Sequence, residues 1–195
     1  IASFDIECDS SHGDFPQPLK DCKKVANNLV VAWIRDIRII QKEDNKSSKY
    51  LKAKEELDLK ANFFKRRIEQ ALGVDEYQDY DTDISKIYLK EDIRSLRSLE
   101  TKEFKTLCKE LYYICDHPIR KVKTDTAMKK AVILVNEKQD EEIKNNGYIT
   151  LETFKSFIKE TSLKTKIPLV ELQAKIITKE VMARFVNREL NNFFK

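Results

Sequence analysis

Turn-forming residues are scarce in this chain, which has 3 glycines and 4 prolines among 195 residues. An average composition would supply about 20 of them in a domain of this length. Because these residues end helices and form tight turns, their scarcity predicts long helices joined by few tight turns. The glycines stand at positions 13, 73 and 147, so the chain cannot form a glycine-rich phosphate loop.

Charge and hydropathy limit further which kind of protein this chain can be. Charged residues make up 36% of the chain and hydrophobic residues 41%, and the periodic apolar spacing favours a folded, charge-coated protein over a disordered one. The longest apolar runs, 29–34 and 131–135, are far shorter than the ~20 residues that span a membrane. No stretch has the pattern of a signal peptide, so we expect an intracellular protein that is not secreted and has no membrane partner. The net charge of +4 is too small to indicate nucleic acid by itself.

Cysteine usage favours reduced thiols over a metal site. The four cysteines form no C-x-x-C pair, which argues against zinc; they are Cys8, Cys22, Cys108 and Cys115. The chain begins at Ile1 without an initiator methionine, and we therefore expect a piece of a longer protein.

The first 18 residues have the pattern of strands. Phe4, Ile6 and Cys8 alternate with polar residues, and a turn-rich run follows at 9–14. Phe15 precedes a proline and therefore avoids helical conformation. The alternation predicts extended chain over residues 1–18.

Residues 19–195 have helical periodicity and predict about six helices. The apolar positions that mark them are Leu19, Cys22, Val25, Ala26, Leu29, Trp33, Ile37 and Ile40; Leu57, Ala61, Phe64, Ile68 and Leu72; Phe104, Leu107, Cys108, Leu111 and Cys115; and Leu172, Ile176, Val181, Phe185 and Leu190. Between the last two stripes we expect helices from about 124 to 143 and over 151–159. The segment 85–90 fits either a short strand or an irregular connection.

Several residues are suited to the ends of these helices. Gly73 can adopt the left-handed conformation that ends the second helix. Thr124 and Thr150 can each cap a helix that follows them. Pro168 is expected to open one last long helix.

Asp5 and Glu7 are the candidate metal-binding residues. Side chains two apart in a strand share a face, so these carboxylates would project together. Paired carboxylates on a buried strand repel each other unless a cation neutralises them, and their oxygens suit Mg²⁺ or Mn²⁺. Two such ions about 4 Å apart can activate a water and stabilise the leaving oxygen of a phosphodiester. The alternative is an exposed edge strand with solvated acids, which the short D-x-E pattern alone favours.

The longer sequence motif around Asp5 and Glu7 resembles a motif of a known family. Ser3-Phe4-Asp5-Ile6-Glu7-Cys8, with Gly13 and then Phe15-Pro16, resembles the first 3′–5′ exonuclease motif of family B DNA polymerases. It is most similar to the delta-like branch, which includes enzymes of large DNA viruses. The resemblance covers about 16 of the 195 residues.

This resemblance implies a fold and an activity. By residue count the chain would be mostly α. Its residues 1–18 would be the first β-strands of a ribonuclease-H-like α/β exonuclease domain, and residues 19–195 a large helical insertion. Asp5 would contact both catalytic metals and Glu7 one of them, close to the 3′ end of the bound strand. The implied reaction is proofreading hydrolysis of a mispaired DNA primer–template 3′ end, in the nucleus or a viral replication compartment, and the insertion would contact DNA or replication accessory proteins.

The departures from the family are large. No second or third exonuclease motif, and no polymerase motif, follows in the sequence. A fragment of such a polymerase, inactive as an isolated piece, is the simplest interpretation. Two alternatives remain: a non-enzymatic helical interaction module with a chance motif match, or another nuclease of the ribonuclease-H-like class without a polymerase.

Four other features have more ordinary interpretations. Tyr80-Asp81-Thr82-Asp83 lacks the glycine of a polymerase catalytic turn, and the loop at Gly147 would place Lys144 among the ligands of a calcium site. His117 is expected to have a capping or surface role before Pro118. The lysine clusters are interpreted as solvated helix faces, with contacts to DNA phosphates as the alternative; they lie at 20–24, 65–67, 121–123 and 129–130.

Overall fold

Seven helices account for most of the residues that this computed structural model describes, which are 22–43, 60–73, 84–87, 101–117 and 121–194. In chain order they are α1 (Lys23–Glu43), α3 (Lys60–Ala71), α4 (Lys102–Cys115), α5 (Thr126–Asn146), α6 (Leu151–Thr165), α7 (Leu169–Ile176) and α8 (Lys179–Phe193). None of the described helices is both long enough and apolar enough to cross a membrane.

The expected fold class is wrong. The residues that the structure describes contain helices and no strand, so they show nothing of a ribonuclease-H-like α/β sheet. Apolar residues in these ranges recur every three or four positions, and a helix buries such a set on one side. The segment 1–18, for which strands were expected, lies outside the described residues.

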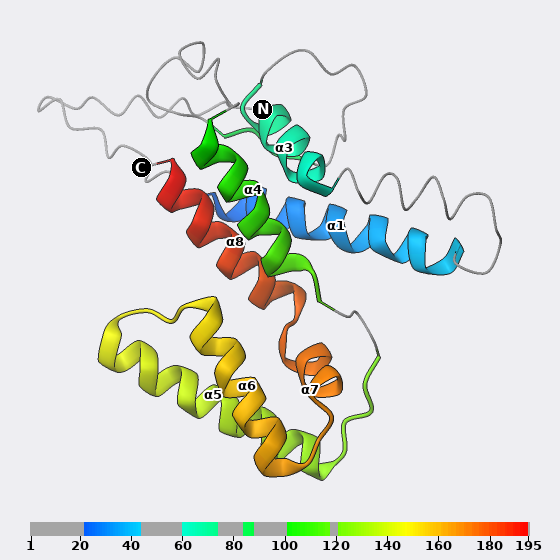
Figure 1. Ribbon diagram of the computed structural model, residues 1–195, viewed down its shortest axis with the longest axis vertical. Coiled ribbons are helices and arrows are strands. Elements are labelled where there is room, and N and C mark those ends of the chain that lie inside the picture. The colour runs from blue at the N-terminus through cyan, green and yellow to red at the C-terminus, as the bar shows by residue number, and fades with distance from the viewer. Residues whose placement is uncertain (1–21, 44–59, 74–83, 88–100, 118–120, 195) are drawn as a thin grey trace, which may run out of the picture.

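The helices pack in two groups (Figure 1). The first group consists of α1, α3, α4 and α8, with α8 lying along both α1 and α4, and α3 packing against α4. The second group consists of α5, α6 and α7. The first half of α8 joins the groups, because the ring of Phe185 lies 5.7 Å from that of Phe154 on α6. Arg184 also donates a hydrogen bond to Gln139 on α5, at 3.0 Å.

Trp33 is the centre of the first group. Its side chain is 2% exposed, and its ring stacks on Phe64 at 5.4 Å and meets Tyr112 edge-on at 5.6 Å. The stripe predicted for the first helix is confirmed where the structure describes it, because the following residues are buried: Cys22, Val25, Ala26, Leu29 and Trp33. Cys22, Cys108 and Cys115 are buried, and among the described residues they form no disulfide.

The predicted stop at Gly73 and cap at Thr150 are confirmed, whereas the helices expected to end near 143 and at 159 continue to Asn146 and Thr165. Gly73 has a φ of 74°, the left-handed conformation expected of it, and Gly147 has a φ of 77° at the end of α5. The Thr150 side chain accepts from the Thr153 backbone N–H at 3.1 Å. The cap of α5 is Asp125 and not Thr124, because the Asp125 carboxylate accepts from the Met128 N–H at 2.8 Å. A charged acceptor makes the stronger bond to a helix N-terminus.

The last long helix expected after Pro168 is two helices. The helical conformation is interrupted between α7 and α8 at Ile177 and Thr178. Ile177 is buried there, and the Thr178 side chain caps α8 by accepting a hydrogen bond from the Val181 N–H. The apolar stripe continues through both helices, so its spacing did not reveal the break. The break matters for the fold, since α7 belongs to the second group and α8 to the first.

Candidate functional site

The predicted metal-binding residues Asp5 and Glu7 lie outside the described residues, so the structure gives no geometry for them. The segment 80–83, which lacks the glycine of a polymerase catalytic turn, also lies outside the described residues. The metal-site hypothesis therefore stays a prediction. Elsewhere, the described ranges contain no cluster of three or more His, Cys, Asp or Glu side chains arranged to hold a metal ion.

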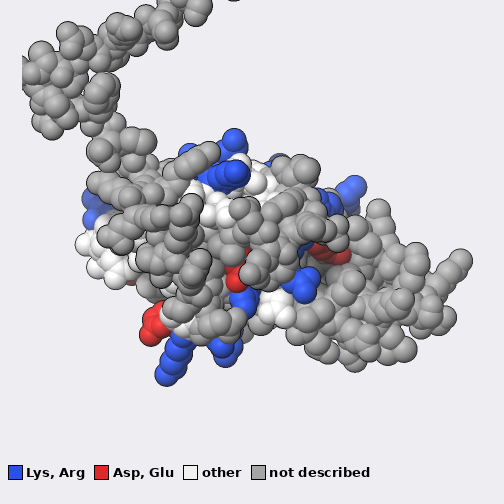
Figure 2. Space-filling view, turned by 90° about the horizontal axis from the view of Figure 1, so that it is seen from above, with Lys and Arg blue, Asp and Glu red and all other residues white. Residues whose placement is uncertain are grey.

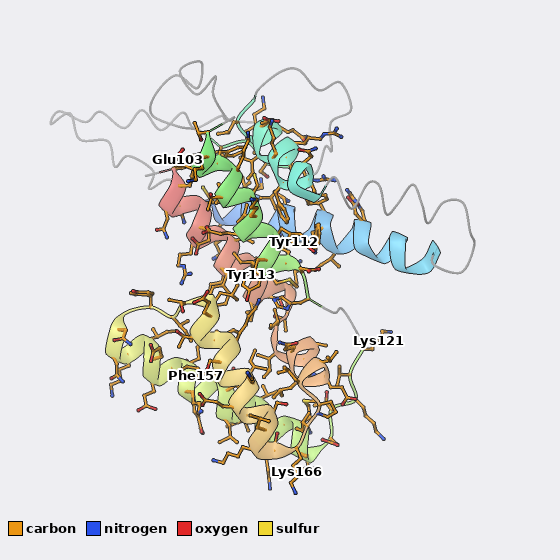
Figure 3. All side chains as sticks on the ribbon, viewed as in Figure 1. Glu103, Tyr112, Tyr113, Lys121, Phe157 and Lys166 are labelled. Carbon is orange, nitrogen blue, oxygen red and sulfur yellow. The ribbon has the colours of Figure 1, made fainter. Side chains whose placement is uncertain are left out.

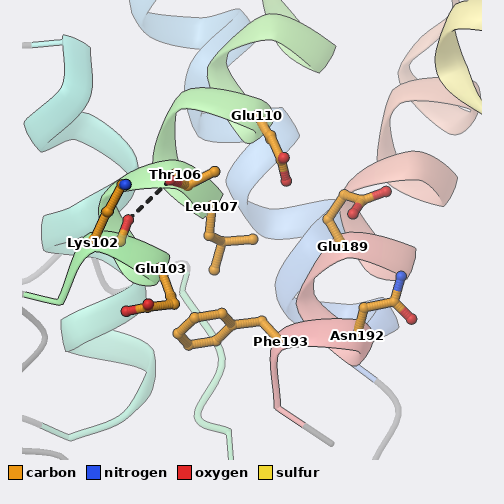
Figure 4. Close-up of a pocket in the computed structure, with 8 residues that line it drawn as sticks. All are labelled: Lys102, Glu103, Thr106, Leu107, Glu110, Glu189, Asn192 and Phe193. Carbon is orange, nitrogen blue, oxygen red and sulfur yellow. Dashed lines mark hydrogen bonds between the residues drawn. The ribbon is translucent and has the colours of Figure 1, made fainter.

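The candidate site that the structure does describe is an open groove of about 450 Å³ between α4 and α8 (Figure 4). Its floor includes Leu107, which is buried, and the ring of Phe193, which packs 5.8 Å from the ring of Phe104. The full lining is Lys102, Glu103, Thr106, Leu107 and Glu110 from α4, and Glu189, Asn192 and Phe193 from α8.

Helical spacing explains how α4 presents its part of the groove. Glu103, Thr106 and Glu110 lie three or four residues apart and so share one face of the helix. They border the apolar stripe with which α4 packs into the core. The Thr106 hydroxyl donates a hydrogen bond to the carbonyl oxygen of Lys102 at 2.9 Å, within the helix. The hydroxyl proton is therefore not available to a ligand in the groove.

Two carboxylates approach each other across the groove. Glu110 on α4 and Glu189 on α8 point towards the same space (Figure 4). Partial burial raises the pKa of Glu110, and the negative charge of Glu189 raises it further. Glu189 also accepts a hydrogen bond from the Arg188 guanidinium at 2.7 Å. A carboxylate pair in a groove that an aromatic ring also lines suits an ammonium or guanidinium group, which would relieve the repulsion between the acids.

The groove was not found from the sequence. Its two walls come from helices about 80 residues apart, and no local pattern states that α4 and α8 lie side by side. The nearest signal is the seven-residue spacing of Glu103 and Glu110 beside an apolar stripe.

His117, for which a capping or surface role was expected, follows α4 at the junction of the two helix groups. Its side chain is half-buried, and its Nε2 atom is buried without a hydrogen-bond partner. Burial lowers the pKa of His117 to about 4, and the positive charge of Lys155 acts in the same direction. The ammonium group of Lys155 lies 3.5 Å from the centre of the Tyr113 ring. Tyr113 stands near the C-terminal end of α4, and this end of the helix faces α6 (Figure 3).

The lysine and arginine clusters have different environments. Arg67, from the cluster at 65–67, donates to the Asp36 carboxylate at 2.9 Å and lies 3.6 Å over the ring of Phe63. That residue therefore has a structural role, linking α3 to α1. On the face seen from above, Lys and Arg side chains of the described residues appear at several places (Figure 2).

Comparison with known proteins shows a short similarity. A stretch of 30 residues, 15% of this chain, is 67% identical to a DNA polymerase of Phaeocystis pouchetii virus, of which it covers 3%. This chain thus spans a small fraction of that polymerase. No protein-family profile matches the chain, and no solved structure matches it.

Proposed function

We propose that this chain is part of a family B DNA polymerase of the large-DNA-virus type. The supporting observation is the 30-residue similarity to a viral DNA polymerase, which agrees in kind with the motif at Ser3–Cys8, Gly13 and Phe15-Pro16. The similarity covers 30 residues and the motif about 16, so neither accounts for the whole helical region. The helical region is accordingly proposed as an insertion rather than as polymerase or nuclease machinery.

The proposed activity is 3′–5′ proofreading, with Asp5 and Glu7 as its metal-binding carboxylates. Two oxygen-rich side chains at this spacing fit Mg²⁺ or Mn²⁺ by donor chemistry, since both ions prefer carboxylate ligands. Such ions, when bound, lower the pKa of a water and stabilise the charge on the leaving oxygen. This chain would contribute the two carboxylates, and residues elsewhere in the longer protein would complete the site. Its partner would be the 3′ end of a primer–template.

The test is Mn²⁺-dependent degradation of a labelled DNA 3′ end by the full-length gene product. The paired change Asp5→Ala and Glu7→Ala should lower the rate by at least 100-fold, because each carboxylate holds an ion. Asp9→Ala and Asp14→Ala form a matched control that removes two acids from the same segment, and it should leave the rate within about twofold. Equal rates for the motif variant and the wild type would refute the exonuclease assignment. The gene sequence beyond Lys195 offers a second check, since it should encode further exonuclease and polymerase motifs.

A second candidate function is a non-enzymatic interaction module. The observation that favours it is the architecture of the described residues. They form a helical assembly that has an acidic groove and contains no strand. A stop codon soon after Lys195, together with no nuclease activity of the product, would support this candidate over the first.

A further inference from the structure

Lysines from two distant parts of the chain gather at one end of the α5–α6 hairpin. The two helices pack against each other and are joined by the short loop 147–150, so they run antiparallel. The start of α5 therefore meets the end of α6, at the lower end of the molecule in Figure 1, where Figure 3 labels Lys166. We call this region the basic end; its residues are Lys129, Lys130, Lys164 and Lys166, all exposed.

Few negative charges balance the basic end. The acids nearest to it in the sequence are Asp125, Glu160 and Glu171. Asp125 caps α5 through the Met128 N–H, and Glu160 pairs with Lys138. Only Glu171, in the first turn of α7, has neither of these two roles. Positive charge on this surface is therefore in excess.

The opposite end of the hairpin is acidic. The second half of α5 carries four acids, Glu137, Asp140, Glu141 and Glu142, against the two lysines Lys138 and Lys144, and Glu152 follows in the first turn of α6. Folding alone does not need this separation, because like charges on neighbouring turns destabilise a helix slightly. An end that concentrates positive charge fits a polyanionic partner, and the acidic opposite end would set the orientation of approach.

The residue types favour a nucleic acid over an acidic protein. Every basic residue of this end is a lysine, and lysine is depleted in protein–protein interfaces, where arginine and aromatic residues are enriched. Lysine ammonium groups are point charges suited to phosphate oxygens. Exposed lysines that neutralise phosphates release counterions, which gives binding without sequence preference.

We propose that the basic end of the α5–α6 hairpin binds the phosphate backbone of DNA. This surface would hold the nucleic acid without base contacts, since the described side chains there are lysines and not the amide or guanidinium groups that read base edges in pairs. The choice of DNA rests on the proposed polymerase function, whereas the charge argument stands without it.

The experiment measures binding of the 195-residue chain to a fluorescein-labelled 24-base-pair duplex by anisotropy, with EDTA present and at several salt concentrations. The test variant is Lys129→Gln, Lys130→Gln and Lys164→Gln. The control is Lys24→Gln, Lys86→Gln and Lys109→Gln, which removes the same charge from exposed positions in the other helix group. Circular dichroism establishes that both variants stay folded.

The test variant should bind at least tenfold more weakly. The slope of log K against log salt should fall by about 2–3, because each phosphate that a lysine no longer neutralises lowers it by about 0.9. The control should stay within about twofold of the wild type. Equal weakening in both variants would mean that net charge alone drives binding, and it would overturn the proposal. Displacement of the duplex by poly-glutamate at equal charge concentration would also overturn it, in favour of an acidic protein partner.

This test is separable from that of the proposed function. The chain with Asp5→Ala and Glu7→Ala should bind the duplex as the wild type does, because binding in EDTA needs no metal site. Lysine-dependent binding with no exonuclease activity in the full-length product would refute the nuclease assignment alone. Exonuclease activity with lysine-independent binding would refute the basic end alone.

Discussion

The indole Nε1 of Trp33 donates a hydrogen bond to the carbonyl oxygen of Cys115 at 2.8 Å, although the two residues are 82 positions apart. Cys115 is the last residue of α4, where carbonyl groups have no partner within the helix. The bond therefore fixes the end of α4 against the middle of α1. The same carbonyl accepts from the His117 N–H at 2.9 Å, so this point also sets the path of the chain towards the second helix group.

Replacing Trp33 should test how far this contact stabilises the fold. Trp33→Phe keeps an aromatic ring but removes the indole donor and part of the buried surface, so we expect a loss of roughly 1–3 kcal/mol in the free energy of unfolding. Urea unfolding measures this loss. It is followed by circular dichroism and not by tryptophan fluorescence, because Trp33 is the single tryptophan of the chain. Tyr113→Phe, at an exposed position, should change stability by less than about 0.5 kcal/mol. Equal values for the two variants would contradict the central role of Trp33.

Gly147 should be sensitive to any residue that avoids a left-handed backbone. It ends α5 at φ 77°, and no atom lies within 4 Å of the position that a Cβ would take, so backbone strain would be the main cost. Gly147→Ala should destabilise the chain by about 1 kcal/mol. Gly147→Asn should lose less, since asparagine tolerates this conformation better. Thermal unfolding of both variants checks the order, and a larger loss for Asn would show that contacts, and not φ, decide.

His117 should make stability depend on pH. Its pKa is lowered to about 4 in the folded chain, whereas an unfolded histidine titrates near 6.5. Between these values the unfolded state binds more protons, so the free energy of unfolding should fall as pH drops from about 6.5 to about 4. Because the ring is partly exposed and solvent screens it, we expect roughly 1–2 kcal/mol rather than the full shift.

The variant His117→Gln isolates that contribution, because it removes the titrating ring and retains a polar side chain. The difference in unfolding free energy between wild type and variant should change over pH 4–6.5 and stay constant above pH 7. Asp116 and Lys155, the charged neighbours that affect the pKa of His117, remain in both proteins. A constant difference across the whole range would contradict the burial of the ring.

Glu110 should destabilise the fold slightly when ionised. Its pKa is raised by burial and by Glu189, so the contribution to stability is favourable below the unfolded pKa and is lost as pH rises through the folded pKa. Glu110→Gln should therefore stabilise the chain at pH 7, by roughly 0.2–0.5 kcal/mol because the carboxylate is mostly solvated. Glu103→Gln, at the other end of the groove, is the control and should have a smaller effect. A loss of stability in Glu110→Gln at pH 7 would mean that the two acids do not repel each other.

The helices and most of their ends could be predicted from the sequence. The stripe through Leu29 and Trp33, the stop at Gly73 and the cap at Thr150 each depend on residues within one or two turns. The break at Thr178 was missed because an apolar stripe runs unchanged through both α7 and α8, and a threonine is common inside helices as well as at their ends. Asp125 displaced Thr124 as a cap because two adjacent residues both carry a suitable oxygen, and the stronger acceptor forms the bond.

Local chemistry thus dictates where this chain is helical, since periodicity, capping and backbone strain act between near neighbours. Which helices meet is a different matter. The contact between Trp33 and Cys115, the facing of Glu110 and Glu189, and the shared end of Lys129 and Lys164 all join residues more than 30 positions apart. Such pairs form when whole helices bury their apolar sides together, and many pairings would bury similar area, so the choice among them depends on how all the side chains fit at once.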